Sequence, residues 1–188
     1  MEYNSIVSAD DAMRGDVSEY LPGISEIFRK HGVEKKYGIW RVHRHFEVGD
    51  DEIMLRDGDV QRAMRTKDLS PDGFYPYTCI VRDGELVPLE FSTAKVETPN
   101  SGFVEDLDMY LSRQGISERV GISLSYNEPE HEINYKDGTS VYFPGTRNGP
   151  NMRTMGWCAS DDLTPGQRTC EESCSGSNGN GQPVHKCV

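Results

Sequence analysis

The chain has 188 residues, only 35% of them hydrophobic, and its 31 acidic residues outnumber its 20 basic ones, giving a net charge of -11. This length fits one compact domain, and 2 Trp, 9 Tyr and 6 Phe supply the aromatic bulk that disordered chains lack. The negative charge repels phosphate backbones and anionic lipids, which argues against nucleic acids and membranes as partners. We therefore expect one soluble domain, 1–188, that binds a small molecule or a partner protein.

The N-terminal stretch as far as Asp16 contains no apolar run flanked by basic residues, so it does not have the pattern of a signal peptide. The sequence also contains no apolar stretch long enough to span a membrane. We expect the protein in the cytoplasm, with the nucleus as the alternative. Thiols stay reduced in both compartments, where a cysteine cluster binds metal more often than it forms disulfides.

Two amphipathic helices are predicted. The first covers 22–31 and stops before Gly32, which suits a left-handed helix end. The second begins at Asn100 or Ser101, either of which can cap it, and stops before Gly115. Each has one apolar stripe that we expect to face the core, formed by Ile24, Ile27 and Phe28 in the first helix and by Phe103, Leu107, Tyr110 and Leu111 in the second.

Similar segments follow the two helices. Residues 30–39 align without gaps on 113–122, and residues 52–59 align on 132–139, each ending at an Asp-Gly turn. Chance similarity is the alternative to an internal duplication. The predicted fold class is α+β: an antiparallel sheet built from a duplicated helix-plus-strands unit with pseudo-twofold symmetry. The repeats would cover about 18–92 and about 101–158, and an irregular tail rich in Cys and His, about 158–188, would follow.

A further hairpin is predicted between the two repeats. Its strands, 78–82 and 85–89, flank the dipeptide Asp83-Gly84, which is a strong two-residue turn signal. Both faces of this hairpin carry apolar residues, so we expect it to be covered on both sides. Cys79 lies within the first strand and is expected to be a buried thiol.

Two histidines provide the first candidate site. In a strand over 39–48, alternation places Trp40 and Phe46 on the core face and His43 and His45 together on the other. Side by side, their imidazoles could bind one metal ion or act as general acid and base. Glu90 or His131, from a neighbouring strand, would be the third ligand; Glu47 is a poorer candidate because it lies farther along the same strand. The alternative is an ordinary solvated strand face.

The His-x-His motif resembles the first signature of the cupin family, with clear departures. Gly38 lies one residue too close to the histidines, and Glu47 and Glu52 do not match the spacing of the family's glutamate. The stretch 138–145 also lacks the histidine of the second cupin signature. No cupin function is therefore carried over to this chain.

The tail holds the second candidate site. Zinc prefers four soft or borderline ligands in a tetrahedron, and a polar segment needs such a tie to stay ordered. The tail offers five donors of this kind, namely Cys158, Cys170, Cys174, His185 and Cys187. We expect these residues to bind a structural zinc ion. The alternatives are two disulfides in an exported protein, or free thiols.

Several segments together resemble a family of small uncharacterised filamentous-fungal proteins. They are 28–33, Tyr37-Gly38, the run His43-Arg44-His45-Phe46, the stretch 86–91 and the Cys-rich end. The resemblance covers most of the chain. It implies a filamentous-fungal source and an intracellular protein, and it implies no activity.

Two functions follow from these observations. The first is a zinc-tied binding or accessory domain whose acidic surface meets a partner protein or a small ligand. The second is a small enzyme with a pocket between the two repeats, in which His43 and His45 are metal ligands or acid and base, with Glu90 as a further catalytic candidate. Paired units of helix and strands enclose metal sites in the glyoxalase-like superfamily, which is a likeness of architecture alone.

Overall fold

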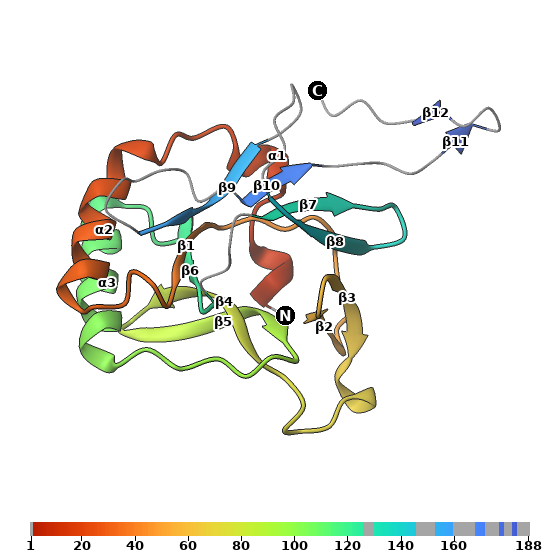
Figure 1. The fold of residues 1–188 in the computed structure, drawn as a ribbon, viewed down its shortest axis with the longest axis horizontal. Coiled ribbons are helices and arrows are strands. Elements are labelled where there is room, and N and C mark those ends of the chain that lie inside the picture. The colour runs from red at the N-terminus through yellow and green to blue at the C-terminus, as the bar shows by residue number, and fades with distance from the viewer. Residues whose placement is uncertain are drawn as a thin grey trace.

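The computed structural model describes residues 2–125, 130–145 and 153–159, with the strands at 168–171, 177–178 and 182–183. Most of it is one curled sheet with hydrogen-bonded neighbours in the order β1-β6-β4-β5-β2-β3-β8-β7-β10-β9 (Figure 1). Strand β9 also pairs with β1, and this closes the sheet into a barrel. The strands are β1 (Gly38–Arg41), β2 (Glu52–Asp57), β3 (Val60–Arg65), β4 (Tyr75–Arg82), β5 (Glu85–Ser92), β6 (Val120–Ser123), β7 (Glu130–Asn134), β8 (Thr139–Pro144), β9 (Arg153–Cys158) and β10 (Arg168–Glu171).

The remaining elements are short or lie on one side of the barrel. Strands β11 (Ser177–Asn178) and β12 (Gln182–Pro183) form a separate pair. The helical elements are η1 (Glu2–Ser5), α1 (Ala9–Ala12), η2 (Ser18–Tyr20), α2 (Leu21–Lys30), η3 (Thr66–Asp68) and α3 (Ser101–Gln114). Within the described ranges, no helix is long and apolar enough to cross a membrane.

The prediction of an antiparallel sheet is wrong, because the sheet is mixed. Strand β2 pairs with β5 in parallel, and β10 pairs with β7 in parallel. Short turns in the sequence indicate antiparallel hairpins, whereas parallel neighbours are joined by long connections that leave no local turn signal. The fold is also mostly sheet with few helices, and the predicted duplicated helix-plus-strands unit is not shown by it.

The two segments that align in the sequence do share a local turn. Gly32 and Gly115 have positive φ angles of 64° and 67°. Beyond them, the backbone N–H of Val33 donates to the carbonyl of Phe28 at 3.0 Å, and that of Ile116 donates to Leu111 at the same distance. The aligned glycines thus mark two helix ends of one type, since a left-handed C-terminal residue favours glycine.

The two predicted helices and their apolar faces are confirmed. Helix α2 ends at Lys30, and α3 begins after Asn100, whose side chain accepts a hydrogen bond from the N–H of Phe103. The helices pack side by side against the outer face of the barrel (Figure 1). Between them, the ring of Phe28 meets that of Phe103 edge-on, with centroids 5.0 Å apart. Strands β1, β4 and β6 complete this core with Ile39, Cys79, Val81, Val120 and Ile122.

The predicted hairpin at Asp83-Gly84 is also confirmed, since Arg82 of β4 pairs with Glu85 of β5. Its strands are covered on both faces. Cys79 and Val81 face the helices, whereas Ile80 faces the barrel interior and packs against the N-terminal segment. Cys79 is fully buried, as expected, and burial raises its pKa to about 12.

The barrel interior has an apolar part and a polar part. The N-terminal segment runs inside the ring of strands (Figure 1), where Tyr3 and Ile6 pack against Trp40, Met54 and Ile80. Elsewhere the inward positions of neighbouring strands are polar, because residues paired across strands point to the same side of a sheet. The buried polar residues of these strands include Arg56, Gln61, Thr78, Glu90, Ser92, Glu130, Glu132, Asn134 and Ser140.

Candidate metal centre

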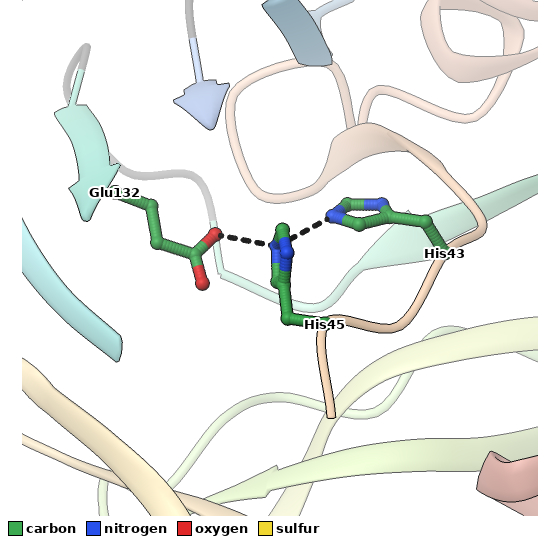
Figure 2. Close-up of side chains that lie close together, drawn as sticks. All are labelled: His43, His45 and Glu132. Carbon is green, nitrogen blue, oxygen red and sulfur yellow. Dashed lines mark hydrogen bonds and ion pairs between the residues drawn. The ribbon is translucent and has the colours of Figure 1, made fainter. Parts of the chain in front are cut away.

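The described part of the chain contains one group of His, Cys, Asp and Glu side chains whose ligand atoms converge closely enough to hold a metal ion. It consists of His43, His45 and Glu132, with all three ligand atoms within 4.8 Å of one another. Figure 2 shows His45 between the other two side chains. The histidines come from the segment after β1, and Glu132 comes from the middle of β7.

The two histidines do not lie in a regular strand, so the prediction of a strand over 39–48 is wrong beyond Arg41. We call residues 42–48 the ligand loop. Arg44, between the histidines, makes an isolated parallel bridge with Ser8 of the N-terminal segment. The loop still places both imidazoles together, with ring centroids 4.7 Å apart. They are not on a solvated face, because His43 is only 3% exposed and the side chain of His45 only 7%.

The distances within the group suit a shared ion. The Nε2 atoms of His43 and His45 are 3.0 Å apart, and the Nε2 atom of His45 is 3.4 Å from Oε2 of Glu132. Ligand atoms about 2.0–2.1 Å from one ion lie about 3.0–3.4 Å from each other when the angle between them is a right angle or tetrahedral. Each of the two pairs that include His45 therefore has a spacing that one shared ion permits.

His43 is held in the protonation state that a ligand needs. Its Nδ1 atom is 2.7 Å from the backbone carbonyl oxygen of Arg41, which can only accept a hydrogen bond. Nδ1 therefore carries the proton, and Nε2 turns a lone pair toward His45. Burial, followed by the neighbouring His45, lowers the pKa of His43 to about 3, which keeps the imidazole neutral at physiological pH. Metal-binding histidines are commonly oriented in this way, through the second nitrogen.

Glu132 was not among the ligands predicted from the sequence, although its neighbour His131 was. In β7 the buried positions are Glu130, Glu132 and Asn134, so these residues face the interior. His131 faces outward, where its ring stacks on that of Phe143 at 5.2 Å. The alternation of two acids and an asparagine with His131 and Ile133 is the signal that could have identified Glu132.

Glu90, the other predicted third ligand, lies in the same interior but outside the three-residue group. It is buried in β5, and its carboxylate accepts a hydrogen bond of 2.9 Å from the hydroxyl of Thr78. The charges of Glu90 and Glu132 both raise the pKa of Tyr142, after the larger effect of burial. Glu47, which was expected to be a poorer third ligand, is exposed and pairs with Arg44 at 3.4 Å.

The zinc site predicted in the tail falls mostly outside the described residues. Cys174, His185 and Cys187 lie there, and of Cys170 only the backbone in β10 is described. Cys158 ends β9 as a half-buried free thiol. The hypothesis of a zinc ion bound by these residues therefore stays a prediction.

Next to the histidines and Glu132, the interior contains a second polar cluster. The guanidinium of Arg56 donates two hydrogen bonds of 2.8 Å to Glu130 and one of 2.6 Å to the hydroxyl of Tyr77. It also lies 3.9 Å above the ring of Tyr142, whose hydroxyl donates to the side-chain oxygen of Gln61. Arg56 is thus engaged with Glu130, two positions from Glu132 on the same strand face.

The fold and the site were compared with known proteins in three ways. No family model matches the chain, and neither a curated protein nor a solved structure resembles it significantly.

Proposed function

We propose that this protein binds one divalent transition-metal ion through His43, His45 and Glu132 and uses it as an open metal centre, in the manner of a small metal-dependent enzyme. The observation that supports the proposal is the convergence of the three ligand atoms within 4.8 Å. Two imidazoles and one carboxylate suit zinc, and they also suit ferrous iron. Zinc is the ion to be tested first.

The described part of the chain supplies three protein ligands, a number that favours a reactive centre over a structural one. Structural zinc sites are closed by four protein ligands, whereas catalytic sites keep a position for water or substrate. Zinc bound in this way would lower the pKa of a coordinated water to about 7. A position left for water or substrate favours the enzyme over the accessory domain, which would need only the structural site predicted in the tail.

The charges of the interior are compatible with a bound cation. Among the described buried residues, the acids Glu90, Glu130 and Glu132 outnumber the arginines Arg41 and Arg56. Arg56 is paired with Glu130, and the guanidinium of Arg41 lies against the sulfur of Met13 and the ring of Trp157. His43, whose pKa is lowered by burial, would add no opposing charge to such a site.

The test is metal binding by the full-length protein and by matched variants. His45→Ala and Glu132→Gln should each lose about one equivalent of zinc relative to the wild type, measured by elemental analysis after equilibration with zinc and desalting. The matched controls are His131→Ala and Glu47→Gln, which alter a half-buried, outward-facing neighbour of Glu132 and an exposed acid of the ligand loop. Both control variants should retain the zinc content of the wild type.

The same experiment separates the centre from the tail. The double variant Cys170→Ser/Cys174→Ser should still bind the one equivalent of zinc that is lost in His45→Ala. A wild-type protein that binds no metal, or binds metal that His45→Ala and Glu132→Gln both retain, would contradict the proposal. Iron and manganese titrations on the same variants would then identify the preferred ion.

A further inference from the structure

The ligand loop is held in place by the N-terminal residues 2–9, which we call the N-terminal strap. The strap consists of η1 and the segment leading into α1. Its side chains fill the apolar part of the barrel, since Tyr3 and Ile6 are 2% and 6% exposed. It is tied to the barrel wall by Arg82 of β4, which pairs with Glu2 at 2.6 Å.

The strap meets the backbone of the ligand loop on both sides of His45. On one side, the N–H of Arg44 donates to the carbonyl of Val7 at 2.9 Å, and the carbonyl of Arg44 accepts from the N–H of Ala9 at 3.0 Å. The Arg44 side chain also donates to the carbonyl of Ile6 at 3.0 Å. The residue that separates the two histidines is therefore fixed by three hydrogen bonds to the strap.

On the other side, one asparagine satisfies both backbone groups of Val48. The side chain of Asn4 donates to the Val48 carbonyl at 2.8 Å and accepts from the Val48 N–H at 3.0 Å. The hydroxyl of Tyr3 lies close enough to the backbone of His45 for that backbone to lower the pKa of Tyr3, against the larger raising effect of burial. The conformation of the loop, and with it the direction of the His45 ring, therefore depends on the docked strap.

We propose that the N-terminal strap sets the metal affinity of the centre, with Tyr3 and Asn4 as positioning residues for His45. This inference rests on the proposed function. Because coupling between two binding events is reciprocal, an ion bound by His45 must stabilise the docked strap by the same free energy that the docked strap contributes to ion binding. Partners that orient a metal ligand typically change affinity about 10- to 100-fold when they are removed.

Point variants of the full-length protein test the proposal. Asn4→Ala removes both contacts with Val48 and should weaken zinc binding about 10-fold or more, measured by competition with a chelator. Tyr3→Phe removes only the hydroxyl and keeps the aromatic packing, so it should weaken binding without unfolding the protein. Asn4→Asp retains the acceptor for the Val48 N–H and should give an intermediate affinity. Circular dichroism and urea denaturation confirm that each variant is folded under the conditions of the titration.

The matched control is Ser5→Ala. Ser5 lies in the same element, but its hydroxyl bonds only to the carbonyl of Glu2 in the contacts described, so its removal should leave the affinity within about 2-fold of the wild type. A second measurement is amide hydrogen exchange at Ala9 and Val48. Zinc should slow exchange at both positions in the wild type and should not do so in His45→Ala.

The outcomes distinguish this inference from the proposed function. If the wild type binds no zinc at His45, the proposed metal centre and the role of the N-terminal strap are both wrong. If the wild type binds zinc and Asn4→Ala and Tyr3→Phe bind it equally well, the strap does not position the ligand and only this inference fails. The role of the N-terminal strap would also be overturned if zinc leaves amide hydrogen exchange at Ala9 unchanged in the wild type.

Discussion

The guanidinium of Arg56 and the carboxylate of Glu130 face each other inside the barrel and share two parallel hydrogen bonds, each 2.8 Å long. Arg56 comes from β2 and Glu130 from β7, which are separated in the sheet by β3 and β8. The pair therefore connects strands across the interior that do not pair by their backbones. Such a bidentate pair combines charge attraction with a fixed geometry.

Removing one partner of the Arg56–Glu130 pair should strongly destabilise the protein. Glu130→Gln leaves the Arg56 charge buried without its counter-charge, and we expect the free energy of unfolding to fall by about 3–5 kcal/mol in urea denaturation. The double variant Arg56→Met/Glu130→Leu should recover more than half of this loss, because no unpaired charge is left. The control is Glu97→Gln, at an exposed pair with Lys36, where a change below about 1 kcal/mol is expected. Equal losses at the two pairs would contradict the prediction.

The contact between the two helices should make stability depend on pH. Asp106 of α3 accepts hydrogen bonds from Lys30 at 2.5 Å and from His31 at 2.7 Å, and these bonds, with Lys30 first, lower its pKa. A lowered pKa in the folded state stabilises the protein above the pKa of the unfolded state, about 3.9, and this stabilisation is lost as the pH falls.

We therefore expect Asp106→Asn to melt below the wild type at pH 7, and the difference in melting temperature to close as the pH falls below about 4. Thermal unfolding followed by circular dichroism between pH 3 and pH 7, about the range set by the carboxyl pKa, provides the measurement. Glu105→Gln, at an exposed position of the same helix, controls for the loss of one acidic charge. If the difference in melting temperature between Asp106→Asn and the wild type stays the same near pH 3, the lowered pKa of Asp106 is not its cause.

Two glycines should respond in opposite ways to alanine. A Cβ at Gly121 of β6 would lie 2.3 Å from the backbone carbonyl oxygen of Cys79, so β4 and β6 would have to separate. We expect Gly121→Ala to cost about 1–3 kcal/mol in the free energy of unfolding, as overpacking does. At Gly102 of α3 the nearest atoms are at 3.5 and 3.7 Å, which is ordinary contact, and Gly102→Ala should stabilise the helix by about 0.5–1 kcal/mol. A similar effect at both positions would contradict this account.

Local features of the fold could be predicted from the sequence, and non-local ones could not. The helices ending near Gly32 and Gly115 and the turn at Asp83-Gly84 depend on neighbouring residues, and the structure confirms all three. The parallel contact of β2 with β5, in which Met54 pairs with Glu90, has no signature in either strand. The choice between an antiparallel and a mixed sheet therefore could not be made from alternation and turns.

The sequence predicted part of the candidate site: it indicated the two histidines but not Glu132. His43 and His45 are two residues apart, so their proximity followed from the sequence even though the strand expected to hold them ends at Arg41. Glu132 reaches them only because β7 lies across the barrel, and its inward direction depends on a strand register that one residue would reverse. The predicted ligand His131 and the observed one, Glu132, lie on opposite faces of the same strand.

The position of β1 in the barrel has a consequence for folding during synthesis. Ile39 pairs with Ile122 of β6 on one side and with Trp157 of β9 on the other, and both partners lie far downstream. While the chain is being made from its N-terminus, β1 therefore has two open edges until most of the protein has been synthesised. Open apolar edges are templates for association with other chains, and distant pairings form slowly. The nascent chain should be most prone to aggregation before Val120–Ser123 emerges, and one edge of β1 stays open until Arg153–Cys158 follows.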